Sequence, residues 1–172
     1  KKMEYITSSD FHFKDTAVAL GKFEGIHRGH QLLMDEVKKQ ELHGLRSVVF
    51  TFDRPTRLTL TGDTEYKQIY TKKERREILE KRGIDILIEH PFTKEFAALT
   101  PDRFIREVLV EKVGAKVIVV GTDFHFGKNR SGSITDLEKL EEECGYHLIV
   151  VEKLQLNGKD ISSTRIRASL EK

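Results

Sequence analysis

The sequence predicts an α/β fold with a doubly wound, mostly parallel sheet flanked by helices. Apolar runs rich in Val and Ile alternate with helical patterns, which is the order of strand–helix–strand units. The runs are nearly continuous rather than alternating apolar and polar, as expected for parallel strands covered on both faces. They lie at residues 16–21, 46–52, 84–89, 116–121 and 146–152.

Helix boundaries follow from residues that cap helices. Thr71 and Glu74 form a capping-box pattern, and Gly83 is placed to end that helix. The charged run 72–82 within it is interpreted as a solvated helix face. Other expected boundaries are Gly29 to Gly44 with Leu32, Leu33 and Val37 inward, Thr100 and Pro101 to Gly114, and Ser133 or Thr135 to Gly145.

Composition indicates one globular domain over residues 1–172. Hydrophobic residues make up 38% and charged residues 34%, and the net charge is only +2. That balance argues against a dedicated nucleic-acid binder, and no apolar run is long enough for a membrane span. Cys144 is the single cysteine, which excludes an internal disulfide and a cysteine zinc cluster and fits a cytoplasmic setting.

The stretch GKFEGIHRGH, residues 21–30, is the first candidate site. Gly21 ends the first predicted strand, and His27, Gly29 and His30 fall where the next helix begins. A helix start presents free N–H groups and the positive end of a dipole, and glycine lets a ligand approach the backbone. Two histidines three residues apart share a helix face and can donate hydrogen bonds to phosphate oxygens. This pattern predicts a phosphate site.

Other chemistries for this stretch are weaker. A metal site lacks a third ligand at helical spacing. Neither a Walker loop nor a GxGxxG pattern accompanies it, which disfavours a P-loop NTPase and a standard dinucleotide fold. A fortuitous pair of histidines on a helix remains as the plain alternative.

The stretch ISSTRIR, residues 161–167, is the second candidate site. Ser162, Ser163 and Thr164 are placed as hydroxyl donors at a helix start, and Arg165 and Arg167 supply guanidinium forks for phosphates. The alternative is an ordinary cap on a terminal helix. Two phosphate-suited segments at opposite ends of one α/β domain favour a shared triphosphate cleft.

The stretch VGTDFHFGKNRSG, residues 120–132, follows a predicted strand and is expected at the same sheet edge. It combines Asp123, the aromatic pair Phe124 and Phe126, and the basic pair Lys128 and Arg130. Phenylalanine rings can stack on a ring system, and the glycines allow close backbone approach. The alternative is a connecting loop with phenylalanines that face the core.

Together these segments resemble a known family. HxGH at 27–30 with ISSTRIR at 161–167 is similar to the nucleotidyltransferase α/β-phosphodiesterase superfamily. FTFDRP, FAALTPDRFI, GTDFHFG and NGKDISSTRIRASL narrow the resemblance to the FMN adenylyltransferase module of bacterial bifunctional riboflavin kinase/FAD synthetases, over nearly the whole chain. The resemblance implies a Rossmann-like nucleotidyltransferase fold.

The resemblance also implies a reaction. FMN and ATP, with Mg2+, would give FAD and pyrophosphate by direct in-line attack. His27, His30 and Arg167 would be the catalytic residues, and no metal ligand is assigned. The ATP-binding residues would be Gly21, Phe23, Gly29, Ser162, Ser163, Thr164 and Arg165, and the flavin-binding residues Asp53, Asp123, Phe124, Phe126, Gly127 and Arg130.

In the bifunctional proteins a riboflavin kinase module follows, and we expect none within residues 1–172. Two alternatives to the adenylyltransferase stay open. One is a module that binds flavin or nucleotide without turnover, motivated by Glu24 and by residues 54–56, where the family pattern differs. The other is a nucleotidyltransferase for another phosphate acceptor.

Overall fold

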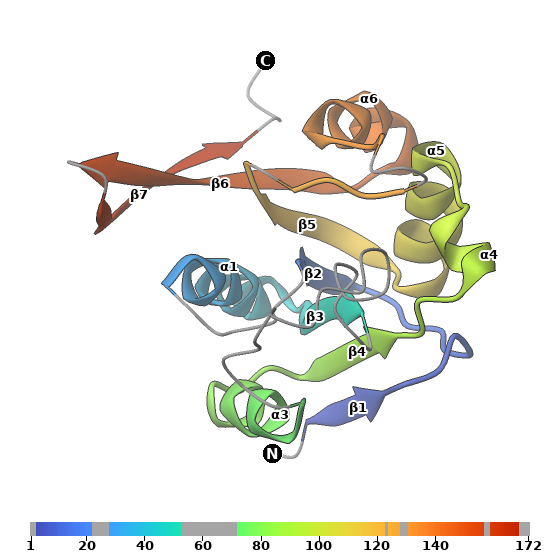
Figure 1. Cartoon of the computed structure of the whole chain (residues 1–172), viewed down its shortest axis with the longest axis horizontal. Coiled ribbons are helices and arrows are strands. Elements are labelled where there is room, and N and C mark those ends of the chain that lie inside the picture. The colour runs from blue at the N-terminus through green and yellow to red at the C-terminus, as the bar shows by residue number, and fades with distance from the viewer. Residues whose placement is uncertain are drawn as a thin grey trace, which may run out of the picture.

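The structure is a computed structural model that describes residues 3–21, 28–52, 72–122, 124–127, 131–156 and 159–168. For residues 28–30, 52, 72, 152–156 and 159–168 it describes the backbone alone. Within these residues the chain forms one seven-stranded sheet in the order β1-β4-β3-β2-β5-β6-β7 (Figure 1). The strands are β1 (Glu4–Ile6), β2 (Thr16–Leu20), β3 (Arg46–Phe52), β4 (Ile86–His90), β5 (Ala115–Gly121), β6 (His147–Leu156) and β7 (Lys159–Ala168).

The sheet is parallel except at one edge. β1 through β6 pair in parallel, and β7 runs antiparallel to β6. From β2 the chain builds outward through β3 and β4 on one side, and β5 and β6 then extend the sheet on the other. The strand order therefore reverses between β2 and β5, where ligands bind in doubly wound sheets. The doubly wound, mostly parallel sheet is confirmed, as are the five predicted strands, β2 to β6. Sequence reasoning missed the two edge strands, the short β1 and β7.

Helices cover both faces of the sheet (Figure 1). One face carries α1 (Arg28–Lys39) and α3 (Lys72–Lys81), with the short 3-10 helix η1 (Gln40–His43) after α1. The other face carries the single turns α4 (Lys94–Ala97) and α5 (Pro101–Arg103), the π-helix η2 (Phe104–Lys112) and α6 (Ile134–Cys144). The sheet is thus the middle of three layers.

Successive side chains of the strands point to opposite faces of the sheet and pack into two separate hydrophobic cores. On the α1 side, Leu33, Met34 and Val37 are buried against Ala17 and Val49. Leu32 is partly buried there, so the inward face predicted for this helix is confirmed. On the other side the buried residues of η2 are Phe104, Ile105, Val108 and Leu109, which pack on Val18, Phe50 and Ile118 among others.

The cap residues act largely as predicted. The Thr100 hydroxyl accepts a hydrogen bond from the Arg103 N–H at 3.3 Å, and Pro101 takes the first helical position. The Asp136 carboxylate accepts from the N–H of Ser133, which opens α6. The segment after Arg103 differs from the ordinary α-helix expected, since the Val113 N–H donates to the Val108 carbonyl five residues back. Thr71 lies outside the described residues.

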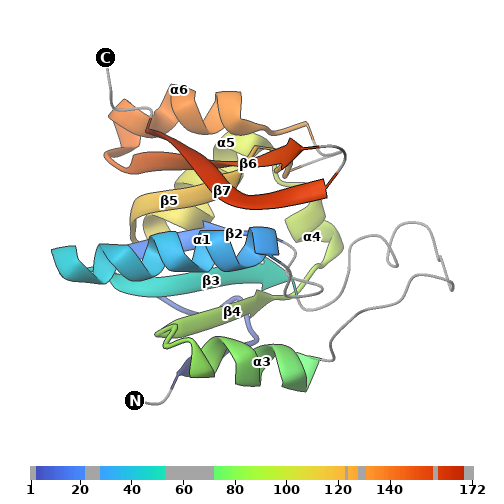
Figure 2. The ribbon, with the colours of Figure 1, turned by 90° about the vertical axis from the view of Figure 1, so that its left-hand side faces the viewer.

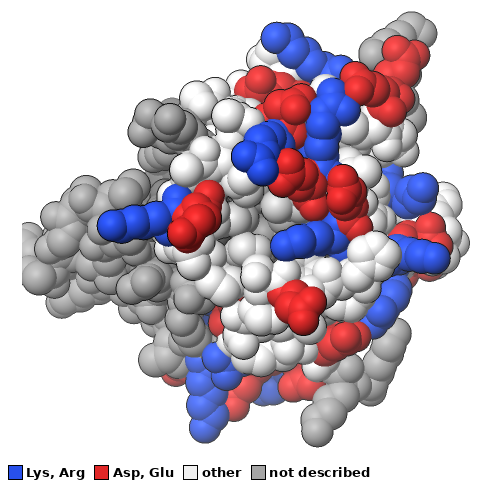
Figure 3. Space-filling model, turned by 90° about the vertical axis from the view of Figure 1, so that its right-hand side faces the viewer, with Lys and Arg blue, Asp and Glu red and all other residues white. Residues whose placement is uncertain are grey.

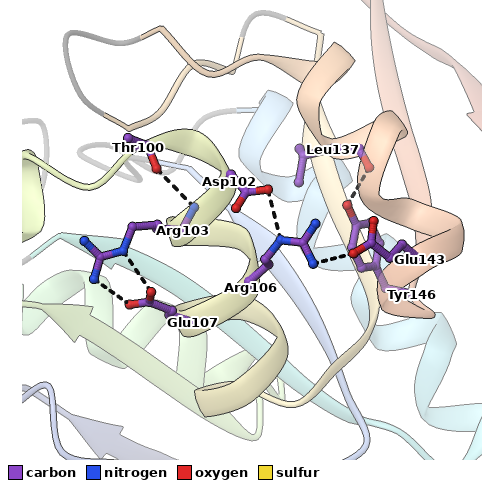
Figure 4. A network of polar contacts seen from close by, with 8 residues as sticks. All are labelled: Thr100, Asp102, Arg103, Arg106, Glu107, Leu137, Glu143 and Tyr146. Atoms are coloured by element: carbon purple, nitrogen blue, oxygen red, sulfur yellow. Dashed lines mark hydrogen bonds and ion pairs between the residues drawn. The ribbon is translucent and has the colours of Figure 1, made fainter.

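Ion pairs join the helices of the η2 side. Arg106 donates to Asp102 one turn earlier at 2.9 Å and to Glu143 of α6 at 2.6 Å, while Arg103 pairs with Glu107 (Figure 4). Hydrogen bonding to the two carboxylates raises the pKa of Arg106. The surface over these helices shows basic and acidic side chains interspersed rather than gathered by sign (Figure 3). The Arg106–Glu143 pair joins η2 to α6, whereas the other two pairs join α5 to η2.

Candidate active site

The first motif lies at the carboxyl edge of the sheet, where the strand order reverses. β2 ends at Leu20, and the N–H of the next residue, Gly21, donates to the Phe50 carbonyl of β3 at 3.4 Å. α1 begins at Arg28, which places Gly29 and His30 in its first turn. The predicted strand–motif–helix order is therefore confirmed. Phe23 and His27 lie outside the described residues.

The start of α1 has the properties of an anion site. α1 is 12 residues long and packs against β2, β3 and β5. Its first-turn N–H groups have no partner within the helix and point out of its amino end, beyond the carboxyl edge of the sheet. The helix dipole adds positive potential at the same end, and no acidic side chain stands in the first turn to offset it.

The second motif occupies a strand rather than the helix start that sequence reasoning expected. Residues 162–167 form part of β7, which pairs with β6 in antiparallel register. Ile161, Thr164 and Ile166 are β-branched, and such residues favour a pleated strand over a helix. The helix prediction rested on the cap preference of Ser and Thr, and the long pairing with β6 overrides that preference. The predicted helix start is therefore wrong.

The strand nevertheless brings part of this motif to the carboxyl edge. Thr164 pairs with Lys153, two residues beyond Val151, and Val151 pairs with Gly121 at the end of β5. Ser162, Ser163 and Arg165 lie on the same stretch of β7, and Arg167 lies opposite Val150, just below the edge. β7 and α1 lie on the same side of the molecule (Figure 1, Figure 2). β7 is three strands from β2, or roughly 14 Å at the usual spacing.

The third motif starts directly after β5. The Phe124 N–H donates to the Gly121 carbonyl at 3.2 Å, which turns the chain at the strand end. Phe126 and Gly132 then exchange two backbone hydrogen bonds, of 3.1 and 2.8 Å, which close the base of the intervening loop. Asp123, Lys128 and Arg130 lie outside the described residues. The base of the loop is thus fixed at the sheet edge.

The two phenylalanines of this motif have different environments. The ring of Phe126 is only 4% exposed and belongs to the η2-side core, with its centroid 5.4 Å from that of Phe104. Phe124 is half-buried and stacks on Phe126 at 5.6 Å and 19°. The core-facing alternative therefore describes Phe126, whose side chain has little surface to offer a ligand. Phe124 stays a candidate flavin contact, and Gly127 follows at the loop base.

A buried charged cluster near the end of β4 was missed by sequence reasoning. Glu89 is 1% exposed and accepts hydrogen bonds from Arg75 at 2.7 Å and from the Tyr5 hydroxyl, and Arg76 lies 3.7 Å away. Burial, and then the Glu89 hydrogen bond, raise the pKa of Tyr5 to about 12. Arg75 is 4% exposed, so the solvated-face interpretation of 72–82 is wrong at this position. A glutamate at the end of the apolar run 84–89 was the available signal.

The described residues hold no group of three or more His, Cys, Asp or Glu side chains that could bind a metal ion. Asp53 and Asp123, which were predicted for the flavin site, and Glu24 of the first motif lie outside those residues. Among the helices of the described ranges, none has the length and apolar character needed to cross a membrane.

These features define a class: a doubly wound α/β protein with an anion-suited helix start where its strand order reverses. The chain belongs to the FAD synthetase family, whose model matches residues 10–165. It is 32% identical over 155 residues to the bifunctional riboflavin kinase/FMN adenylyltransferase of Escherichia coli K12, covering 89% of this chain and 49% of that protein. The Listeria monocytogenes protein of the same name is 30% identical over 167 residues, covering 96% and 52%. The chain thus spans about half the length of these curated relatives.

Solved structures agree on the fold. A crystal structure from Streptococcus pneumoniae, described as a macrolide-efflux protein, matches with a TM-score of 0.74 and 27% identity, over 95% of this chain and 54% of that one. Pantoate-beta-alanine ligase from Francisella tularensis, solved with beta-gamma ATP and beta-alanine, matches with a TM-score of 0.56 over 93% of this chain and 71% of the ligase. At 13% identity the second match speaks for the fold alone.

Proposed function

We propose that this chain is an FMN adenylyltransferase. The phosphate of FMN attacks the α-phosphorus of ATP in line, the bond to the β-phosphate breaks, and FAD and pyrophosphate leave. The placement of Gly29 and His30 in the first turn of α1, where the strand order reverses, carries this proposal. Membership of the FAD synthetase family, matched over residues 10–165, supports the choice of FMN and ATP as substrates.

The nucleophile of this reaction is the FMN phosphate itself, so the transfer needs no nucleophile from the protein. The protein's part is to position the substrates and to stabilise the charge that develops. The first-turn N–H groups of α1 bind phosphate oxygens, and Gly29 leaves room for their approach. His27 and His30 donate to the oxygens that gain charge as the bond to the pyrophosphate breaks. Ser162, Ser163, Thr164, Arg165 and Arg167 hold the triphosphate from the β7 side.

The loop after β5 is proposed to hold the flavin. Phe124 supplies an apolar surface at the carboxyl edge, and Asp123, Gly127 and Arg130 complete the site with Asp53 after β3. Phe126 supports this loop from inside the core, as its burial requires. The flavin therefore lies beyond the ends of β3 and β5.

Mg2+ enters as part of the MgATP substrate. When bound with the nucleotide, it would neutralise phosphate charge and orient the leaving pyrophosphate. We propose a cytoplasmic protein, since ATP and FMN are found there, and a single nucleotidyltransferase domain over residues 1–172. A riboflavin kinase module is the proposed partner, by analogy with relatives whose names contain both activities.

The test is direct. The purified chain is mixed with FMN and MgATP, and the flavins are separated while pyrophosphate is measured. FAD and pyrophosphate in equal amounts are expected. Saturable FMN and ATP binding with no pyrophosphate would instead indicate a binding module, and pyrophosphate with another phosphorylated acceptor but not with FMN would indicate a different transferase.

A further inference from the structure

A row of aromatic rings connects the carboxyl end of β4 to the loop after β5. Each ring packs on the next, and the rings come from a strand, two helices and the loop. Successive centroids are 4.2, 5.8, 5.4 and 5.6 Å apart along the row His90, Phe96, Phe104, Phe126 and Phe124. Such pairs add stabilisation beyond the area that they bury, and their geometry fixes each ring relative to its neighbours.

Phe104 is the centre of this row. It is 3% exposed and lies at the start of the π-helix η2. Its ring meets Phe96 edge-on, meets Phe50 of β3 edge-on at 5.9 Å, and packs at a tilt on Phe126. One side chain therefore sets the distance between the end region of β3, the turn α4 and the loop after β5.

The ring of Phe126 is coupled to the backbone of its loop. The backbone N–H and the backbone carbonyl of Phe126 both form hydrogen bonds with the backbone of Gly132. A Cβ on Gly132 would lie 2.8 Å from the Phe126 ring and 2.8 Å from its carbonyl oxygen, closer than real Cβ contacts come. Because the fit is this tight, a shift of the Phe126 ring displaces the base of the loop.

The two candidate segments lie over opposite faces of the sheet. α1, with Gly29 and His30 in its first turn, packs on the core that holds Leu33 and Met34. Phe104 and Phe126 belong to the other core. A substrate pair that meets across the carboxyl edge therefore has its triphosphate on the α1 side and its acceptor on the side of the aromatic row.

We infer that Phe104 is a positioning residue for the flavin acceptor, acting through Phe126 on the loop after β5. This inference rests on the proposed FMN adenylyltransferase activity. Phe104 is not proposed to contact either substrate. It packs on the Phe126 ring, and Phe126 in turn holds the base of the loop after β5 in place. Truncation of Phe104 should raise KM and Kd for FMN. KM for ATP, which binds on the α1 side, should stay nearly unchanged.

The test compares Phe104→Leu with Val108→Ala. Val108 lies on the same π-helix, is 4% exposed in the same core and takes no part in the ring row, so its truncation matches the loss of packing. KM for FMN, KM for ATP, kcat, the FMN dissociation constant and Tm are measured for each. For Phe104→Leu we expect KM and Kd for FMN to rise roughly five- to tenfold, with KM for ATP within about twofold of the parent chain.

The control defines what a merely structural role would do. Val108→Ala should lower Tm by a similar amount and leave KM for FMN within about twofold. Equal changes in both substrates for Phe104→Leu, or the same FMN change in Val108→Ala, would overturn the inference. A parent chain that makes no FAD would contradict the proposed function instead.

A second variant covers the case in which Phe104→Leu does not fold. Gly132→Ala keeps every ring and presses its new methyl group against Phe126. It should raise KM for FMN by a similar factor and spare KM for ATP. Unchanged FMN kinetics in a folded Gly132→Ala chain would contradict the coupling between ring and loop.

Discussion

Glu89 and Arg75 form a buried ion pair, with the guanidinium 2.7 Å from the carboxylate and side chains 1% and 5% exposed. The pair joins the first turns of α3 to the end of β4, and Tyr5 and Arg76 close around it. Arg76 also lies over the Tyr5 ring, with its guanidinium carbon 3.9 Å from the ring centroid. One carboxylate thus organises residues from β1, α3 and β4.

Breaking this pair should be costly. Glu89→Leu leaves Arg75 charged and buried without its carboxylate, and we expect the free energy of unfolding to fall by about 3–5 kcal/mol. Adding Arg75→Met should recover a large part of the loss, because an apolar pair of similar volume needs no solvation. Urea unfolding of the two single variants and the double variant measures this. A loss below about 1 kcal/mol in Glu89→Leu would show that the pair is not structural.

The same cluster predicts a stability loss in alkali. The pKa of Tyr5 is raised to about 12 in the folded chain, against about 10 for the unfolded chain. The unfolded state therefore loses the phenol proton first, so this contribution is complete below pH 10 and is lost as the pH rises toward 12. Tyr5→Phe should flatten that limb of the stability curve. Urea midpoints between pH 9 and 12 for both chains test it, and parallel curves would refute it.

Alanine substitutions at two glycines should distinguish the cost of left-handed backbone from the cost of a steric clash. Gly114 and Gly44 both have positive φ, at 68° and 81°. A Cβ at Gly114 would lie 2.2 Å from the Phe13 carbonyl oxygen, whereas a Cβ at Gly44 would meet nothing within 4 Å. Gly44→Ala should cost about 1 kcal/mol, the price of left-handed backbone alone. Gly114→Ala should cost at least about 3 kcal/mol in the same unfolding assay. Equal losses of unfolding free energy in the two variants would show that the backbone at Phe13 moves away from the new methyl group at little cost.

The histidine of α1's first turn should affect turnover more than flavin binding. His30→Ala removes a donor for charge that develops on the leaving phosphates, so we expect kcat to fall about 10²- to 10³-fold. The FMN dissociation constant should stay within about twofold. His43→Ala, at an exposed histidine in η1 beyond the other end of α1, is the matched control and should behave like the parent chain. Full turnover in His30→Ala would exclude the proposed role.

The strands and helix ends could be predicted because the signals are local. Continuous Val and Ile runs indicated β2 to β6, and Thr100, Ser133 and Gly145 acted as caps from their own backbone chemistry. The start of α1 followed from the same logic, and with it the place of Gly29 and His30. The family resemblance rested on the short motifs at residues 27–30, 120–132 and 161–167, which can also be recognised from local sequence.

The rest depended on partners distant in sequence. Ser162 to Thr164 have the composition of a helix cap, yet β6 pairs with that segment as a strand. Phe126 looks like a ligand contact until η2 brings Phe104 against it. Arg75 belongs to a charged run, and only Glu89 on β4 explains its burial. Propensity describes a segment alone, whereas these positions are decided by neighbours in space.

The most direct test of adenylyl transfer follows the phosphorus atom. The chain is incubated with FMN, Mg2+ and ATP labelled in the α-phosphate, and the flavins are separated from the nucleotides. The account predicts that the label appears in FAD, in step with release of unlabelled pyrophosphate. Label that remains in ATP while FMN is bound, or that passes to an acceptor other than FMN, would contradict the central claim.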